Sequence, residues 1–248
     1  MHEYLNKIDK DKLPEHIAVI MDCNGRWARA HGKPRVFGHK NGVKSVREIS
    51  EASAELGIGY LTLYAFSTEN WSRPALEVTA LMGLLVETIR SEVSTLNKNN
   101  IRLKAIGDLS KLPKRSQNAL LEGIEQTSRN TGMTLILALN YSSRWEITTT
   151  IQKIAQDSKD GLVDPESIDE AFISQRLATA EFPDPELLIR TSGEHRISNY
   201  LLWQIAYSEL YFTDVFWPDF RKVHLYKALV NYQGRERRFG KTSEQLKT

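Results

Sequence analysis

Hydrophobic residues along the chain fall into five short runs, separated by longer segments with helical spacing. The runs lie at residues 17–21, 60–66, 101–107, 134–140 and 187–191. Short apolar runs rich in β-branched residues are typical of buried strands. Segment 40–57 illustrates the helices, because its apolar positions recur every three or four residues and Gly57 stands where a C-terminal cap belongs. The pattern predicts strands that alternate with helices.

This alternation indicates the fold class. Strands joined by helical segments of crossover length pair in parallel, because a parallel connection must travel back along the sheet. We therefore expect an α/β fold with a largely parallel sheet. The apolar content of 41% over 248 residues is enough for a sizeable core. No linker, repeat or low-complexity tract divides the sequence, so we expect one domain over 1–248, with frayed tails at about 1–15 and 235–248.

Composition and charge remove several classes of function. Lys and Arg number 33 against 31 Asp and Glu, and the net charge of +2 predicts no general attraction to nucleic acid. The single cysteine excludes an internal disulfide and a multi-cysteine zinc site. No apolar run approaches the length of a membrane span, and the charged start does not resemble a signal peptide. We expect a cytoplasmic protein that does not bind nucleic acid.

The end of the first predicted strand has an unusual charge distribution. Asp22 is followed by 25 residues without Asp or Glu, and that segment is rich in Lys, Arg and His. In parallel α/β sheets, ligands bind beyond the carboxyl ends of the strands, where helix N-termini favour anions. Asn24 and Gly25 can form a tight turn there. The loop predicts an anion site, although a capping Asp followed by a solvated basic face fits the loop alone equally well.

Two further strand ends carry polar side chains of the same kind. The segment after the second strand contains hydrogen-bonding groups, at Ser67, Thr68, Glu69, Asn70, Trp71 and Arg73. The segment after the fifth strand contains Arg190, His195, Arg196 and Ser198, with Glu209 further on. Arginine side chains match phosphate oxygens in a bidentate geometry. Each segment alone is typical of a surface turn, but together they predict one shared phosphate-binding mouth.

At these residues the sequence resembles the cis-prenyltransferase family, and most closely its bacterial undecaprenyl diphosphate synthases. The matching blocks are HIAVIMDCNGRWA, GKPRVFGHKNGV, YLTLYAFSTENWSRP, LNYSSRWEI and IRTSGEHRISNYLLWQIAYSELYFTDVFWPDF. They follow the family's order and span nearly the whole chain. The resemblance implies a single domain with a central, largely parallel six-stranded sheet, surrounding helices, an apolar product tunnel and a homodimer.

The resemblance also implies a reaction. The family condenses isopentenyl diphosphate onto an allylic diphosphate, usually farnesyl diphosphate, with Mg²⁺, and each step adds a cis double bond. The expected product is a long-chain polyprenyl diphosphate such as undecaprenyl diphosphate, a lipid-carrier precursor for cell-wall synthesis. Another product length, or a non-catalytic member that stabilises a partner synthase, is the alternative. Product release implies peripheral contact with the inner face of the membrane.

The family pattern assigns roles residue by residue. Asp22 is implied to engage Mg²⁺, Asn70 to serve as proton acceptor, and Glu209 to be a second metal-binding acid that the partner subunit can supply. The implied allylic residues are Cys23, Asn24, Gly25, Arg26, Trp27, Arg35 and His39. The block after the second strand adds Ser67, Thr68, Glu69, Trp71 and Arg73, and the homoallylic site takes Arg190, Arg196, Ile197 and Ser198.

This chemistry accounts for the acid-free segment. A departing diphosphate needs its growing negative charge stabilised by Arg side chains, N–H groups and metal. A carboxylate about 4 Å from a phosphate would repel it by roughly 4 kcal/mol at an effective dielectric near 20. Asp22 is the exception, because Mg²⁺ prefers oxygen ligands. Cys23 departs from the family pattern, which usually has glycine there, and its Cβ would crowd the allylic diphosphate.

Residues 75–96 offer a wide apolar helical face for the growing chain. The face comprises Leu76, Val78, Leu81, Leu85, Ile89, Val93 and Leu96. Periodicity alone favours ordinary core packing for these residues. The resemblance puts part of this helix on the tunnel wall, with Met133 or Leu135 closing the floor.

Overall fold

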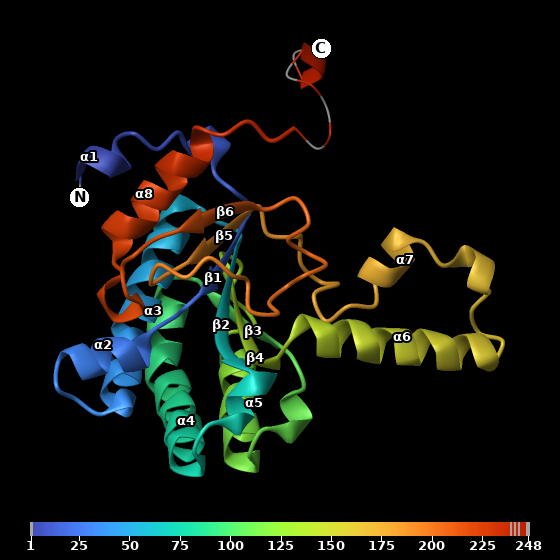
Figure 1. The fold of residues 1–248 in the computed structure, drawn as a ribbon, viewed down its shortest axis with the longest axis horizontal. Helices are drawn as coiled ribbons and strands as arrows, with labels where there is room; N and C mark the ends of the chain where they lie inside the picture. Colours follow the sequence, from blue (N-terminus) through green and yellow to red (C-terminus); the bar gives the residue numbers. More distant parts are fainter. Residues whose placement is uncertain (1, 239, 241, 243, 247–248) are drawn as a thin grey trace.

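The fold is built on one six-stranded sheet (Figure 1). The computed structural model describes residues 2–238, 240, 242 and 244–246. The strands are β1 (His16–Ile20), β2 (Tyr60–Ser67), β3 (Arg102–Ile106), β4 (Thr134–Tyr141), β5 (Leu187–Arg190) and β6 (Glu209–Phe212). Their order is β3-β4-β2-β1-β5-β6, and every pairing is parallel. The predicted α/β fold with a six-stranded parallel sheet is therefore confirmed.

Helices cover this sheet and also extend beyond it (Figure 1). They are α1 (His2–Leu5), α2 (Asn24–Ala30), α3 (Arg35–Leu56), α4 (Ala75–Lys98), α5 (Lys114–Gln126), α6 (Ser143–Lys159), α7 (Glu170–Ser174) and α8 (Lys222–Gln233). One core cluster joins α3, α4, α5 and α8 to a face of the sheet. Helix α6, with α7 beside it, projects away from the body as an arm. No helix among the described residues is both long enough and apolar enough to cross a membrane.

Strands β1, β4 and β5 are buried on both faces, which explains why they are nearly continuous apolar runs in the sequence. In β1, Ile17 and Val19 belong to the core cluster under α3, α4 and α8. Ala18 and Ile20 point to the opposite side and pack with Tyr200. Parallel strands that are covered on both faces lose the alternation of half-exposed strands.

Helix α1, near the start of the chain, lies beside α8, near its end (Figure 1). Tyr4, Leu5 and Ile8, from the expected N-terminal tail, pack partly buried against the main core. At the other end, Arg235 donates a hydrogen bond of 2.7 Å to Glu209 Oε2. The expected C-terminal tail lies partly outside the described residues.

Candidate active site

Asp22 stands just beyond the end of β1, and hydrogen bonds to its backbone and its side chain hold it there. Its backbone N–H donates to Thr191 Oγ1 at 2.9 Å, and the Ser192 hydroxyl donates to its carbonyl at 2.9 Å. Its carboxylate accepts a hydrogen bond from Arg190 Nη2 at 2.6 Å and one from the Cys23 N–H at 2.7 Å. The parallel pairing of β1 with β5 brings these groups together.

The Asp22 carboxylate is suited to hold a hard cation. Burial opposes its ionisation, but the hydrogen bond and charge of Arg190, together with the Cys23 N–H, lower its pKa below the ordinary value. Its side chain is 28% exposed and lines two adjoining polar pockets. Mg²⁺ takes one or two carboxylates and completes its shell with water and substrate phosphate. The described residues contain no cluster of three or more acids, His or Cys that could hold a metal alone, so a cation here needs such external ligands.

The first polar pocket has a volume of about 370 Å³ and a largely cationic wall. Its lining includes Asp22, Cys23, Asn24, Gly25, Arg26, Arg29, Arg35, His39, Asn70, Arg73 and Arg196. Gly25 permits a close approach, because a Cβ at that position would lie 3.0 Å from the Arg35 guanidinium carbon. The loop after β1 and the start of α3 therefore place several arginine side chains around this pocket.

Glu77 in the first turn of α4 organises two of these cations. It accepts contacts from Arg35 Nε at 3.1 Å and from Arg73 Nη1 at 3.2 Å, and it is 9% exposed. His39 lies beside the same groups, and burial, assisted by the charge of Arg73, lowers its pKa to about 4. Its Nε2 and the Oδ1 of Asn24 are buried without a hydrogen-bond partner among the described residues. The pocket thus holds polar atoms that a ligand would satisfy.

The second polar pocket has a volume of about 470 Å³ and lies over β2 and β5. It is lined by Asp22, Tyr64, Ser67, Glu69, Asn70, Arg73, Arg190, Arg196, Ser198 and Asn199, among others. Arg190 donates to Ser198 Oγ at 2.7 Å and to the Arg196 carbonyl. Asp22, Asn70 and Arg73 line both pockets, so two ligands bound there would meet beside these residues.

Asn70 is held in a fixed orientation between the two pockets. Its Oδ1 accepts a hydrogen bond from the Ser67 N–H at 3.2 Å, and the two side chains form a capping box at the turn Thr68–Ser72. Asn70 therefore has a local structural role in addition to its position between the pockets.

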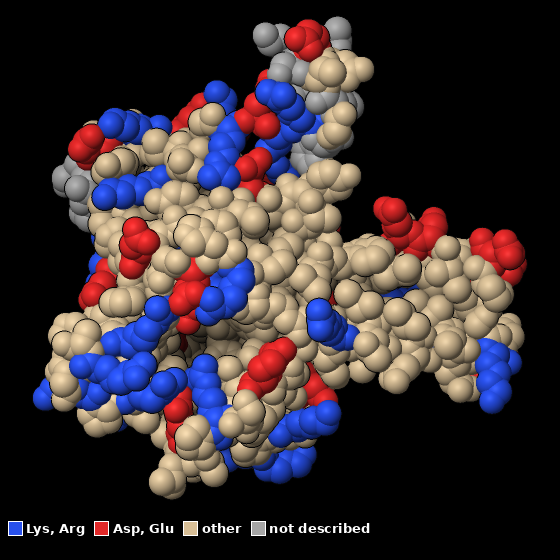
Figure 2. Space-filling model, in the orientation of Figure 1, with Lys and Arg blue, Asp and Glu red and all other residues tan. Residues whose placement is uncertain are grey.

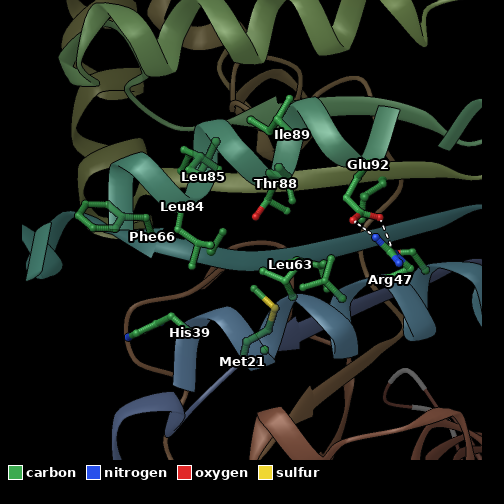
Figure 3. Close-up of a pocket in the computed structure, with 18 of the residues that line it drawn as sticks. Met21, His39, Arg47, Leu63, Phe66, Leu84, Leu85, Thr88, Ile89 and Glu92 are labelled. Carbon is green, nitrogen blue, oxygen red and sulfur yellow. Dashed lines mark hydrogen bonds and ion pairs between the residues drawn. The ribbon is translucent and has the colours of Figure 1, made fainter. Parts of the chain in front are cut away.

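An apolar cavity of about 160 Å³ adjoins the first pocket and runs between α3, α4 and the sheet (Figure 3). Met21, Asn24, His39 and Leu81 line both spaces. Part of the predicted apolar face of α4 lines this cavity. Leu81, Leu85, Ile89 and Leu96 line the cavity, whereas Val78 and Val93 do not and Leu76, in the first turn of α4, is 88% exposed. Of the two predicted floor residues, Leu135 lines the cavity and Met133 does not.

Residues 20–240 match the family model described as "Putative undecaprenyl diphosphate synthase". The chain belongs to this family. The isoprenyl transferase of Chlorobaculum tepidum is 55% identical over 236 residues, which cover 95% of this chain and 89% of that protein. The ditrans,polycis-undecaprenyl-diphosphate synthase ((2E,6E)-farnesyl-diphosphate specific) of Vibrio cholerae is 51% identical, with 97% and 96% covered. The protein is therefore a prenyltransferase.

Solved structures give the same result. The lavandulyl diphosphate synthase of Lavandula x intermedia, in complex with dimethylallyl diphosphate, superposes with a TM-score of 0.89 at 39% identity, covering 92% of this chain and 99% of that one. A probable undecaprenyl diphosphate synthase of Campylobacter jejuni superposes with a TM-score of 0.76 at 32% identity, with the same coverage.

Several predicted site residues of this prenyltransferase do not line the polar pockets. Trp27 Nε1 donates to Asp219 Oδ2 and Trp71 Nε1 donates to Asn140 Oδ1, each at 2.7 Å, so both indoles brace the loops that carry the site. Neither of them lines a polar pocket, and the same holds for Thr68 and Ile197.

Glu209 is separated from Asp22 within the chain. It begins β6 and pairs with Leu187, whereas Phe212, at the other end of β6, pairs with Arg190 beside the site. It therefore lies at the opposite end of the strands from Asp22, where it forms an ion pair with Arg235 at 2.7 Å. One chain does not bring the two predicted metal ligands together.

The sequence prediction also missed functional candidates. Tyr64, Glu77, Glu194 and Asn199 all contact or line the site. Glu194 forms ion pairs with both Arg26 and Arg196 and so connects the two pockets. The sequence does single out Glu194, because it is the only acidic residue between Arg190 and Glu209.

Proposed function

We propose that this prenyltransferase adds isopentenyl diphosphate repeatedly to farnesyl diphosphate and makes undecaprenyl diphosphate. The observation that carries the proposal is the joining of three spaces: two cationic pockets that share Asp22, Asn70 and Arg73, and an apolar cavity that opens from the first. A reaction that joins two diphosphate esters and stores a growing hydrocarbon needs this combination. The (2E,6E)-farnesyl-diphosphate specificity named for the Vibrio cholerae relative supports the primer.

The allylic diphosphate belongs in the first pocket, because the apolar cavity that would take its chain opens there. Arg26, Arg35 and Arg73 would stabilise the charge that develops as the diphosphate departs. Isopentenyl diphosphate belongs in the second pocket, where Arg190 and Arg196 would bind its phosphates. Asp22 would hold Mg²⁺, which would supply neutralisation of the charge on the departing diphosphate.

The bond changes follow from this placement. The isopentenyl double bond attacks C1 of the allylic chain, the C1–O bond breaks, and the diphosphate leaves with the electron pair. Loss of a C2 proton from the isopentenyl unit then forms the new cis double bond. A neutral amide is a poor base, so Asn70, fixed by Ser67, would orient a phosphate oxygen or water that accepts this proton.

We further propose a homodimer in which Glu209 of one protomer completes the site of the other. Its separation from Asp22 within the chain motivates this. Two inactive variants, Asp22→Ala and Glu209→Ala, should recover activity when mixed and refolded together, because the heterodimer keeps one complete site; no recovery would argue against a shared site.

Release of a long-chain lipid suggests contact with the membrane at the basic corner, defined here as Arg29, Lys33, Lys40 and Lys44 around Phe37. Lys and Arg side chains gather over α2 and the start of α3 (Figure 2), and Lys33 Nζ lies 6.0 Å from the ring centroid of Phe37, which is 40% exposed. Basic residues around an exposed aromatic ring favour an anionic lipid surface. Sedimentation with phosphatidylglycerol vesicles, but not with phosphatidylcholine vesicles, is expected, and Lys40→Gln with Lys44→Gln should weaken it.

One experiment tests the central proposal. Purified protein is incubated with labelled isopentenyl diphosphate, farnesyl diphosphate and Mg²⁺, with EDTA as control, and the product is sized by mass spectrometry. A product of about eleven isoprene units that requires Mg²⁺ supports it. Absence of any elongation would favour a non-catalytic role, and a shorter or longer product would correct the chain length.

A further inference from the structure

The apolar cavity carries polar groups at its deep end, beside the apolar side chains of Ile89 and Leu96 (Figure 3). One stripe of α4 faces it at a spacing of three and four residues, and this stripe reads Leu81, Leu85, Thr88, Glu92 and Thr95. Leu81 also lines the diphosphate pocket, so this end of the stripe is the mouth. The stripe therefore passes from leucine at the mouth to polar residues farther along α4.

The facing helix shows the same change. On α3 the lining passes from Val43 and Val46 to Arg47, Ser50 and Glu51. The Oγ of Ser50 is buried and has no hydrogen-bond partner among the described residues. Polar groups from α3 and α4 thus line the same deep part of a cavity whose sheet wall remains apolar, with Leu103 and Leu135.

Arg47 and Glu92 meet across this deep region (Figure 3). Arg47 Nε donates to Glu92 Oε2 at 2.8 Å, and a second guanidinium nitrogen donates to Oε1. The Glu92 side chain is 11% exposed and that of Arg47 is 51% exposed, so the pair reaches from the cavity wall to the surface. A buried ion pair contributes little net stability compared with apolar packing. Separating or removing one partner is nevertheless strongly destabilising, because the other charge is left buried without compensation.

We propose that the Arg47–Glu92 ion pair is a determinant of product length, because it clasps α3 to α4 across the deep end of the cavity. The proposal rests on the chain elongation proposed above. The cavity of about 160 Å³ is close to the roughly 150 Å³ that accommodates benzene, so the two helices must separate as the product grows. At the depth of the pair, further separation would pull a buried carboxylate away from its guanidinium. Elongation stops where the hydrocarbon end meets this resistance.

Product lengths of paired variants test the clasp. Arg47→Met with Glu92→Met keeps the bulk and removes both charges, and it should shift the product distribution upward by at least one isoprene unit. Arg47→Glu alone places two acids together and should also lengthen products. The exchange Arg47→Glu with Glu92→Arg rebuilds the pair and should restore the wild-type distribution. Arg90→Met with Glu122→Met is the matched control, because that 3.6 Å pair joins α4 to α5 and neither residue lines the cavity.

Two results would overturn the proposal. Unchanged product lengths in the double Met variant, with a changed melting temperature, would make the pair a structural tie only. Failure of the charge exchange to restore the distribution would also count against a clasp. Binding of non-reactive alkyl diphosphates of increasing length tests the same point without turnover: wild-type affinity should fall beyond a limiting length, and the double Met variant should lose this limit. An identical limit in both proteins would refute the clasp, whereas a wild type that never elongates would refute the proposed function.

Discussion

Arg190 and Asp22 form the central contact between the ends of β1 and β5, with 2.6 Å between Nη2 and Oδ2. The Arg190 side chain is only 3% exposed, whereas that of Asp22 is 28% exposed. The acid therefore compensates a buried cation on one side and faces both polar pockets on the other.

Replacing Asp22 with Ala should remove Mg²⁺-dependent activity and also destabilise the protein. Turnover should fall by about a hundredfold or more, because the leaving group loses its metal. Arg190 would lose its charge partner, so unfolding free energy should drop by roughly 1–3 kcal/mol. Steady-state rates over a Mg²⁺ titration and urea denaturation measure the two effects. Near-normal rates at low Mg²⁺ would remove Asp22 from the mechanism.

Asn70→Ala should lower turnover more than substrate binding. The change removes the group that faces both pockets and one half of the capping box with Ser67. A lost cap costs about 1 kcal/mol of stability, and a misplaced proton acceptor should cost at least about tenfold in kcat. The comparison is Thr68→Ala, in the same turn but outside both pockets. If Asn70→Ala kept its wild-type kcat, Asn70 would be a capping residue only.

Hydrophobic patterning predicted five of the six strands, because β1, β4 and β5 are buried along their whole length and β2 and β3 are buried over part of theirs. The sixth strand, Glu209–Phe212, was missed by this criterion: it has four half-buried residues at the sheet edge and pairs only with β5 among the described strands. Leu76 shows the opposite error. It fits the helical period of α4, but its side chain lies on the outer side of the first turn, whereas Val78 of the same turn packs in the core.

The site was predicted as a set of strand ends, since parallel pairing brings those ends together. The Arg35–Glu77 and Arg26–Glu194 ion pairs could not be predicted, because tertiary geometry brings together residues that are far apart in the sequence. The backbone conformation of Cys23 could not be predicted from the sequence either. It lies in the left-handed region, with φ of 68°, and its N–H donates to the Asp22 carboxylate.

Cys23→Gly should therefore raise stability slightly. A non-glycine residue in the left-handed region costs about 1–2 kcal/mol, and the added freedom of glycine in the unfolded chain offsets about 0.5–1 kcal/mol of the gain. Loss of the Cβ should also lower the allylic KM or raise turnover. Cys23→Ala is the control, because it removes the thiol and keeps the strain. Equal gains from Ala and Gly would assign the effect to sulfur.

Protein stability should fall as the pH is lowered from about 6.5 to 4. Burial lowers the pKa of His16 to about 4, and its Nδ1–H donates to the Pro183 carbonyl while Nε2 accepts from Thr62. In this pH window His16 is protonated in the unfolded chain but stays neutral in the folded protein. The free energy of unfolding therefore falls by about 1.4 kcal/mol per pH unit. His39, whose pKa is also about 4, contributes in the same direction. Urea denaturation across this range should show a shallower slope for His16→Gln; an unchanged slope would mean that His16 titrates normally.

Leu135→Ala should lengthen the products, whereas Met133→Ala should not. Both side chains are buried, at 4% and 3% exposure, but only Leu135 of the two lines the apolar cavity. Each truncation should cost about 2–5 kcal/mol of stability, so the pair is matched for destabilisation. Only the Leu135 change enlarges the space that the growing chain occupies. Product sizing by mass spectrometry, at a temperature where both variants stay folded, separates the two outcomes. Equal lengthening by both variants would mean that general loosening of the core lengthens the products, and that the cavity wall at Leu135 does not set their length.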